Sequence, residues 1–491
     1  MAESQKPLKL HLLHFGCAKN LVDSERILGL LNSAFGSLFV STPDPKEADL
    51  ALVNTCAFLK DAVNEALEGV FQTRKALKPG ARLVVLGCLP SRYKELTDLP
   101  EADAILPRER YGELPSLVSA LFPRSVRKRE GGFQDIGPGK TRKGGAPANA
   151  RERAPEGTLR GPSPPPFRKT KTLIPGDPGW DFEETPRVLS TPPFRAYLKI
   201  SEGCSRRCSF CVIPKIRGKL VSRPLDALVR EAEDLSARGV LELTLVAQDL
   251  LSWRDGDQAL LSLLKRLNDL PGLIWLRLLY LRPEAVTKKL LRGLKGLEKV
   301  VPYLDVPLQH ASKKILQAMG RRSLDPLSAS RLIRDAWPEA ALRSSFITGF
   351  PGETEKDFLE LYEFLAAEKL QHAGFFIFSP EEGAPAAGLP GRVSPRVAQR
   401  RLQMLRELQT RVSEELNLKR LGTRPLILTD GASPENPLLR VGRTAFQAPE
   451  TDGLVYFQGR QPPDGKMVRG RIIEARGFDL LASLEDPPEK P

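Results

Sequence analysis

Cysteine is scarce in this chain, at six of 491 residues. A disulfide-built secreted domain needs a far denser supply, so metal ligation or catalysis in a reducing compartment is the expected use of these thiols. Long apolar runs are also missing, because no stretch approaches the roughly 18 to 20 residues of a membrane span. The N-terminus, MAESQKPLKLHLLHFG, has no signal-peptide layout. We therefore expect a cytoplasmic protein without a membrane partner.

The chain has no acidic surplus. It carries 74 Lys and Arg against 60 Asp and Glu, which gives a net charge of +14. This balance suits a partner that is nucleic acid or lies beside it, and does not separate the two cases. At roughly 150 residues per domain, the length favours about three domains.

The order of apolar runs predicts a multidomain α/β protein. In residues 8–122, strand-length runs at 8–15, 50–54 and 83–86 are each followed by a helical pattern, which favours an open parallel sheet, although any one run also fits a buried helix. From 194 to 390 we expect a partial (βα)6 barrel, two repeats short of closure. Its predicted strands are 196–201, 241–247, 274–281, 301–306, 342–349 and 374–379.

A composition break separates these two α/β domains. Residues 123–193 hold 13 Pro and 10 Gly, with 14 basic against 8 acidic residues. Chain breakers at this density disfavour a core, so we interpret the segment as a disordered linker or insertion. It is either a plain solvated tether or a basic arm that contacts RNA. After the barrel, an amphipathic helix is predicted within 391–421, and a small β-barrel within 422–485.

The sharpest motif is a C-x3-C-x2-C that follows the first strand of the central domain. Its thiols are Cys204, Cys208 and Cys211. Three thiolates this close can bind three irons of a 4Fe-4S cluster and leave the fourth iron open, as a catalytic site requires. A zinc knuckle or unligated thiols are the alternatives, and zinc would need a fourth ligand that is not close in the sequence.

The other three cysteines follow three different strands. Cys17, Cys56 and Cys88 each come within about three residues of a predicted strand end. The carboxyl ends of parallel strands face one crevice, so these thiols are expected to converge there and to bind a second cluster. Three partly buried structural cysteines would give the same pattern.

The central motif, with Phe210 before its last cysteine, resembles that of the radical S-adenosylmethionine (SAM) enzymes. The resemblance implies that SAM binds the open iron and is cleaved to a 5′-deoxyadenosyl radical. With the second cysteine set, the whole chain is similar to the methylthiotransferases. That family implies two 4Fe-4S clusters, sulfur from the auxiliary one, methyl from a second SAM, and a C-terminal TRAM module. The similarity rests on the motifs GCAKNLVDSE at 16–25, NTC at 54–56 and GC at 87–88.

Within this family, the chain looks like the branch that modifies the β-carbon of an aspartate in the small-subunit ribosomal protein uS12. The segments that carry this resemblance are KNLVDSE at 19–25, IPKIRGK at 213–219, PLQH at 307–310 and APETDG at 448–453. The near-neutral terminal domain, with 8 basic and 7 acidic residues in 424–484, also favours a protein substrate over tRNA. A tRNA adenosine methylthiotransferase and a non-catalytic iron–sulfur protein of ribosome assembly remain the alternatives.

Residues at predicted strand ends are the candidates for cofactor binding. Besides Phe210, they are Gln248, Asp249, Gln309, His310, Gly349 and Glu353. His310 fits a hydrogen-bonded structural role equally well, and the GFPGE turn at 349–353 fits a tight loop before a helix. The resemblance implies two partners, namely uS12 or the 30S subunit as substrate and a low-potential flavodoxin or ferredoxin as reductant.

Overall fold

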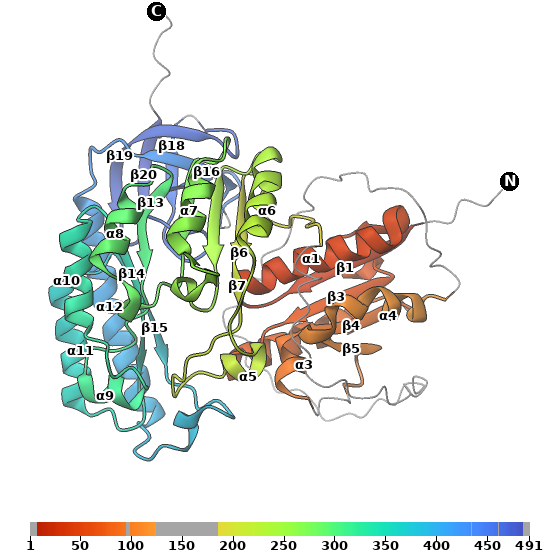
Figure 1. The fold of residues 1–491 in the computed structure, drawn as a ribbon, viewed down its shortest axis with the longest axis horizontal. Coiled ribbons are helices and arrows are strands. Elements are labelled where there is room, and N and C mark those ends of the chain that lie inside the picture. The colour runs from red at the N-terminus through yellow and green to blue at the C-terminus, as the bar shows by residue number, and fades with distance from the viewer. Residues whose placement is uncertain (1–6, 95–98, 124–184, 434, 460, 485–491) are drawn as a thin grey trace, which may run out of the picture. The chain divides into compact units, whose positions relative to one another are not determined.

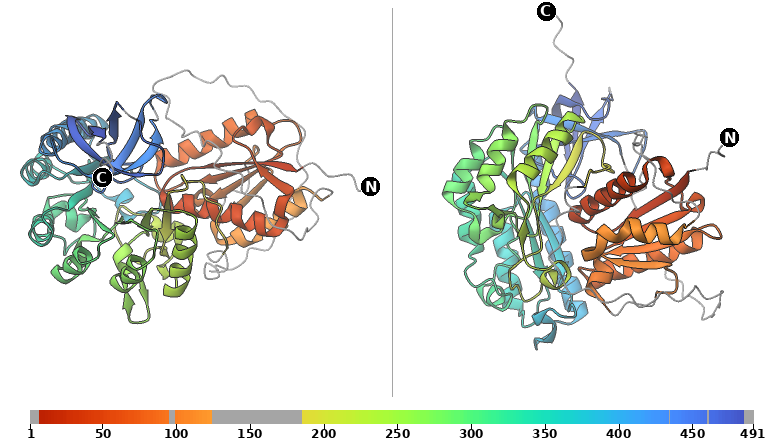
Figure 2. Two further views of the ribbon diagram at one scale, coloured as in Figure 1. Left: turned by 90° about the horizontal axis from the view of Figure 1, so that it is seen from above. Right: turned by 45° about the vertical axis from the view of Figure 1, so that its right-hand side comes forward.

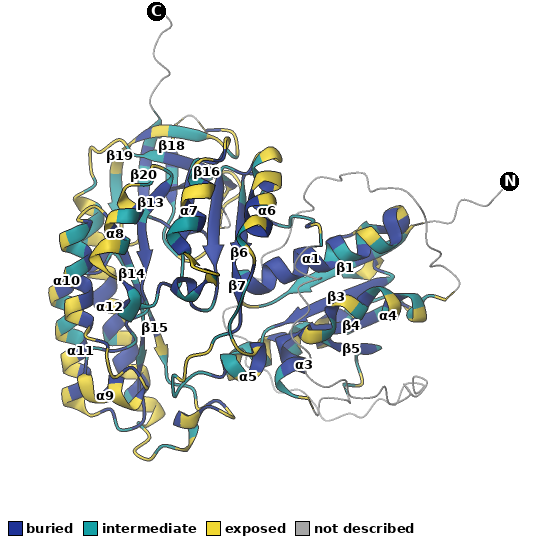
Figure 3. Ribbon diagram, in the orientation of Figure 1, coloured by how far each residue is buried: buried dark blue, intermediate teal, exposed yellow. Residues whose placement is uncertain are grey.

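The computed structural model describes residues 7–94, 99–123, 185–433, 435–459 and 461–484 (Figure 1). The chain divides into two compact units, Met1–Ser190 and Thr191–Pro491. No described helix is long and apolar enough to cross a membrane. In both units the strands are mostly buried, whereas the helices expose one side to solvent (Figure 3).

The first unit is built on a five-stranded parallel sheet, ordered β2-β1-β3-β4-β5. Its strands are β1 (Leu8–His14), β2 (Phe39–Ser41), β3 (Leu50–Thr55), β4 (Arg82–Gly87) and β5 (Ala104–Pro107). The helices are α1 (Ala18–Phe35), α2 (Lys60–Ala76), α3 (Cys88–Arg92) and α4 (Leu114–Leu121). The predicted open parallel sheet is confirmed, but β2 and β5 were not anticipated because they are only 3 and 4 residues long.

Most of the predicted linker, residues 124–184, lies outside the described residues. Its described end packs on α1 of the first unit. The Arg187 guanidinium forms a buried ion pair with Glu25, and the Ser190 amide donates to the same carboxylate at 2.8 Å. Residues 185–190 are therefore ordered, because a buried charge pair and a backbone bond hold them against α1. The expectation that most of the segment is disordered stays a prediction.

The second unit contains a six-stranded parallel sheet whose strands follow chain order and whose edge strands do not pair with each other. The strands are β6 (Arg195–Lys199), β9 (Glu242–Val246), β12 (Trp275–Leu278), β13 (Val300–Asp305), β14 (Ala341–Thr348) and β15 (His372–Ile377). The helices between them are α6 (Leu225–Ala237), α7 (Leu260–Asn268), α8 (Lys288–Lys295), α9 (Lys313–Ala318), α10 (Pro326–Ala336) and α11 (Glu355–Glu368), on the outer side of the sheet (Figure 2). The predicted partial barrel is thus confirmed.

Shorter elements lie near the end of β6. The predicted strand 196–201 is interrupted at Ile200, and its last part pairs as a small antiparallel ladder. These elements are β7 (Ser201–Glu202), α5 (Ile213–Arg217), β8 (Val221–Ser222), β10 (Arg254–Asp255) and β11 (Gln258–Ala259).

The two faces of the six-stranded sheet differ in polarity. Leu198, Leu243, Leu304 and Leu342 are buried on its outer face. Alternate positions on the inner face are polar and include Lys199, Glu242, Arg277, Tyr303, Asp305, Arg343 and His372. Period-2 alternation therefore gives an apolar face for the helices and a polar interior.

A closed five-stranded barrel follows α12 (Pro395–Leu418), with order β16-β17-β18-β20-β19. Its strands are β16 (Leu426–Ala432), β17 (Arg440–Thr444), β18 (Val455–Gln458), β19 (Met467–Arg476) and β20 (Asp479–Leu484). Leu428 and Ala448 pack in one apolar cluster with Trp275, Val301 and Ala341, which lie at the amino ends of the parallel strands. The small barrel therefore covers the end of the sheet opposite to that from which the cysteine motif emerges.

Candidate active site

The C-x3-C-x2-C motif occupies a loop at the carboxyl end of β6 and β7. Its three thiols lie close enough to influence one another's ionisation. Burial, with the neighbouring Cys208 and Cys204 thiols, raises the pKa of Cys211 to about 12, and burial also raises the pKa of Cys204. Thiols in this environment ionise when a metal binds them, because metal binding displaces the proton.

Segments far away in the sequence fix the backbone of this loop. The Ser209 amide donates to the Met319 carbonyl at 3.0 Å, and the Ser209 hydroxyl donates to the Ala318 carbonyl at 2.7 Å. From the other side, the Ala386 amide donates to the Ser209 carbonyl at 2.8 Å. The end of α9 and the loop after β15 thus set the spacing between Cys208 and Cys211.

A buried charged cluster lies beside the loop and was not predicted from the sequence. Glu202 accepts from Lys199 Nζ at 3.1 Å, from Arg217 Nη1 at 3.0 and 3.1 Å, and from Gln248 Nε2 at 2.8 Å. The Gly203 amide, directly before Cys204, also donates to this carboxylate. Glu202 therefore connects the start of the cysteine loop to β9. Its neighbours Lys199 and Arg217 come from separate segments, so no local pattern revealed the cluster.

Several buried polar atoms at the carboxyl ends of the strands have no hydrogen-bond partner within the described residues. Among them are Ser201 Oγ, Gln248 Oε1, Asp249 Oδ1 and His310 Nε2, of which the last lies 3.7 Å from Glu353 Oε2. Leaving such atoms unpaired costs about 1–3 kcal/mol each, so a polar ligand that bonds them would be stabilised. A ligand with amino, carboxylate and hydroxyl groups, such as SAM, fits this set of donors and acceptors.

Asp249 and Gln309 have geometries that their neighbours impose. Asp249 Oδ2 accepts from the Ser252 hydroxyl at 2.6 Å. It also accepts from Nε of Arg206, a residue of the cysteine loop, at 3.3 Å. Gln309 has a left-handed φ of 71° and pairs with β14 through a bridge to Phe346. Phe210 is partly buried in the cysteine loop.

Gly349 and Glu353 have local packing partners instead of open space. A Cβ at Gly349 would lie 2.9 Å from Ala398 of α12, so the glycine makes room for that helix. Glu353 accepts from Arg401 Nη1 at 2.8 Å, from the Thr348 hydroxyl at 3.1 Å and from a backbone amide. These contacts favour the turn-and-helix interpretation of this segment, because α11 starts two residues later.

The second cysteine set lies on the first unit. Cys17 precedes α1, Cys56 follows β3, and Cys88 begins α3 after β4. Because β1, β3 and β4 are neighbours in a parallel sheet, all three cysteines lie at one edge. A Cβ on Gly16 would lie 2.7 Å from Cys56 Sγ, so the turn before Cys17 lies directly against that thiol.

Buried polar side chains hold these turns in place. The Leu89 amide, directly after Cys88, donates to the Thr55 hydroxyl at 3.2 Å. Asn20 Nδ2 donates to the Phe15 carbonyl at 2.8 Å, and Asn54 Nδ2 donates to the Ser24 hydroxyl at 2.8 Å. Tyr111, which the sequence motifs did not include, donates to Asn54 Oδ1 at 3.1 Å. The motif residues around the cysteines thus hold the backbone of the cysteine-bearing turns in place.

Within the described ranges, no three His, Cys, Asp or Glu side chains converge tightly enough to bind a single metal ion. A cubane cluster does not require such convergence, because each thiolate binds a different iron.

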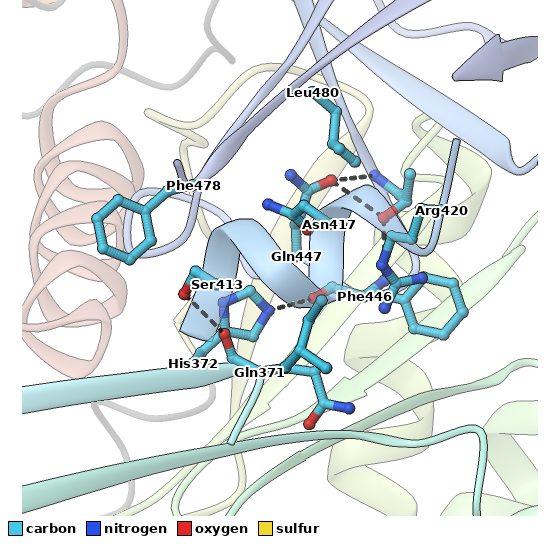
Figure 4. A pocket seen from close by; sticks show the side chains of 11 residues that line it. Gln371, His372, Ser413, Asn417, Arg420, Phe446, Gln447, Phe478 and Leu480 are labelled. Atoms are coloured by element: carbon cyan, nitrogen blue, oxygen red, sulfur yellow. Dashed lines mark hydrogen bonds between the residues drawn. The ribbon is translucent and has the colours of Figure 1, made fainter. Parts of the chain in front are cut away.

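One pocket lies at the opposite end of the six-stranded sheet, between β15, α12 and the small barrel (Figure 4). Most of its polar lining is already bonded. His372 contacts the Phe446 carbonyl at 2.7 Å, and Gln447 accepts from Thr444. The pocket contains none of the residues predicted to bind a cofactor.

Comparisons with known proteins agree with this division of the chain. The radical SAM superfamily model matches residues 198–365, uncharacterized protein family UPF0004 matches 9–106, and the TRAM domain matches 421–484. The ribosomal protein uS12 methylthiotransferase RimO of Syntrophus aciditrophicus is 40% identical over 493 residues, 98% of this chain and 99% of the relative. The protein of the same name from Pelobacter propionicus is 37% identical over 495 residues, 99% of each chain.

Proposed function

Because the chain belongs to the RimO family of radical SAM methylthiotransferases, we propose that its substrate is ribosomal protein uS12. In the proposed reaction a C–H bond at the β-carbon of an aspartate is replaced by C–S–CH3. The observation that carries the chemistry is the placement of two cysteine triads, one on the loop after β6 and β7 and one at the carboxyl ends of three neighbouring parallel strands. The substrate rests on the similarity to uS12 methylthiotransferases over nearly the whole chain.

Cys204, Cys208 and Cys211 are proposed to hold the catalytic 4Fe-4S cluster, with SAM bound beside it. Together these groups supply the one-electron chemistry that removes a hydrogen atom from an unactivated carbon. Glu202 contributes by holding the Gly203 amide and thereby the start of the loop. The unpaired atoms of Gln248, Asp249 and His310 would bind and orient SAM. Three such contacts explain why these atoms remain buried without hydrogen-bond partners among the described residues.

Cys17, Cys56 and Cys88 are proposed to hold the auxiliary 4Fe-4S cluster, which provides the sulfur, while a second SAM provides the methyl group. The amides of Asn20 and Asn54 hold the turns at Cys17 and Cys56, and the Thr55 hydroxyl bonds the segment that begins with Cys88. An electron must also be supplied, and a low-potential flavodoxin or ferredoxin is the proposed donor.

The net charge of +14 keeps tRNA methylthiolation as a second candidate. Against it, residues 424–484 carry 8 basic and 7 acidic residues, without the excess that a nucleic-acid grip requires. The basic segment 123–193, largely outside the described residues, is a proposed contact for ribosomal RNA.

The test is mass spectrometry of uS12 and of tRNA from cells that lack this gene, with and without complementation. We expect uS12 to gain the mass of one S–CH2 increment on complementation while tRNA is unchanged. Complementation with Cys208→Ala should restore nothing, whereas Lys288→Ala, an exposed change on α8, should restore the modification. A gain on tRNA instead would refute the assigned substrate. A chain that forms no 5′-deoxyadenosine from SAM would be a non-catalytic iron–sulfur protein.

A further inference from the structure

The small barrel is bonded to the inner face of every strand of the partial barrel. Three of its side chains and two of its backbone carbonyls make these contacts. On one side of the sheet, Glu450 bonds Arg195 and Tyr197 of β6, and Arg443 bonds Glu242 of β9. In the middle, Arg277 of β12 donates to the Ala445 carbonyl, and Asp452 accepts from Tyr303 of β13 and Arg343 of β14. At the other side, His372 of β15 contacts the Phe446 carbonyl. The β17–β18 loop, residues 445–454, therefore closes the amino end of the sheet.

Asp452 is the most enclosed carboxylate of this loop, with a side chain only 2% exposed. Its Oδ2 accepts from the Tyr303 hydroxyl at 2.7 Å and from the Ala448 amide at 2.8 Å. Its Oδ1 accepts from Arg343 Nη1 at 3.1 Å and lies 3.5 Å from His372 Nδ1. Asp452 thus fixes the direction of the Arg343 side chain inside the barrel.

Arg343 lies between two carboxylates. Its Nε is 3.7 Å from Asp305 Oδ1, at the carboxyl end of β13. The other oxygen of Asp305 accepts from the Tyr280 amide at 3.0 Å, and its backbone carbonyl accepts from the Leu281 amide at 2.8 Å. Asp305 thereby holds the turn that follows β12.

Tyr280 has a backbone conformation that needs such support. Its φ of 62° is left-handed, which is an uncommon conformation for a bulky residue and costs about 1–3 kcal/mol. The Tyr280 carbonyl accepts from the Leu250 amide at 3.2 Å, so the strained turn contacts the segment that carries Gln248 and Asp249. A continuous polar chain therefore runs from Asp452 through Arg343, Asp305 and Tyr280 to the candidate cofactor residues.

We propose that Asp452 is a positioning residue for SAM: through Arg343 and Asp305 it holds the left-handed turn at Tyr280 and, with it, the Gln248–Asp249 segment. This role rests on the proposed function in that SAM is the ligand of that segment. Under this proposal, the APETDG segment of the small barrel helps to position the cofactor-binding residues at the opposite end of the sheet. The charge of Asp452 is what matters, because without it Asp305 is the remaining carboxylate beside Arg343. A guanidinium that shifts toward Asp305 Oδ1 also displaces the carboxylate whose other oxygen accepts from the Tyr280 amide.

The test compares Asp452→Asn with Glu450→Gln in the cluster-loaded full chain. Glu450 lies in the same loop and bonds Arg195 at 3.1 Å and Tyr197 at 3.5 Å, both on β6 and neither a member of the polar chain from Arg343 to Tyr280. Hydrogen exchange of the peptide that spans 278–283 is measured without SAM, and the Kd of SAM is measured by equilibrium binding. We expect Asp452→Asn to speed exchange at Tyr280 and Leu281 and to raise the Kd about tenfold, with neither change in Glu450→Gln.

A second variant separates positioning from loss of packing. Asp305→Asn should reproduce both effects, and the double variant with Asp452→Asn should be no worse than Asp305→Asn alone, because both act on one turn. Additive effects on Kd, equal effects of Glu450→Gln, or unchanged exchange in Asp305→Asn would overturn the proposal. The exchange measurement requires neither SAM nor uS12, so it tests the polar chain even if the proposed function fails.

Discussion

Replacing Glu242 by Gln is expected to lower the free energy of unfolding by about 3 kcal/mol at neutral pH. Glu242 is fully buried at the start of β9, where Arg277 Nε donates to one carboxylate oxygen and Arg443 Nη2 to the other, both at 2.7 Å. Burial alone would raise the pKa of Glu242, but the charges of Arg443 and Arg277 lower it from 4.5 to about 2.

The magnitude follows from that shift. Each unit of pKa difference corresponds to about 1.4 kcal/mol, and Gln reproduces the shape and charge of the protonated acid. Removing one member of a buried ion pair costs about 3–5 kcal/mol, which is consistent with this value. Because the folded pKa lies below the unfolded one, the contribution of Glu242 is present above pH 4.5 and is lost as the pH falls toward 2.

The measurement is urea denaturation of the iron-free, reduced chain at several pH values. The difference in the free energy of unfolding between wild type and Glu242→Gln should have its full value at neutral pH and be less than half as large at about pH 3. Glu450→Gln is the matched control, because its partly exposed pair with Arg195 is worth less than about 1 kcal/mol. A difference that stays constant with pH would refute the assignment of the lowered pKa to Glu242.

Three further variants test the two cysteine sites. Cys208→Ala should abolish cleavage of SAM, measured as 5′-deoxyadenosine, and residual cleavage would refute its role as a cluster ligand. Cys56→Ala should spare SAM cleavage but stop sulfur insertion, so full product from this variant would exclude the auxiliary cluster. Gly87→Ala should lose the iron of the first unit alone, because a Cβ there would lie 2.4 Å from Asn54 Oδ1. Gly80→Ala, also left-handed but with open space, is its control, and equal iron loss in both would contradict this explanation.

Several features could be predicted because they are local. Each predicted strand of the parallel sheets is present, since apolar runs of that length and alternation are typical of buried strands. The predicted ends of these strands also placed Cys17, Cys56 and Cys88 correctly, at the ends of three neighbouring strands. Their role as cluster ligands remains a prediction. Motif spacing alone also suggested Gly349 as a cofactor contact, where the structure shows a packing contact with α12.

The sequence by itself determined which residues form strands, which carry thiols and where each thiol lies relative to a strand end, because periodicity and chain connectivity are local properties. Only the tertiary structure decided which charges meet inside the barrel. Arg443 and Glu242 are 201 positions apart, and Tyr303 and Asp452 are 149 apart. Such pairs leave no periodic signal, because their bonds form only after the strands have curved and the C-terminal barrel has closed over them. The polar chain from Asp452 to Tyr280 therefore exists only in the folded molecule.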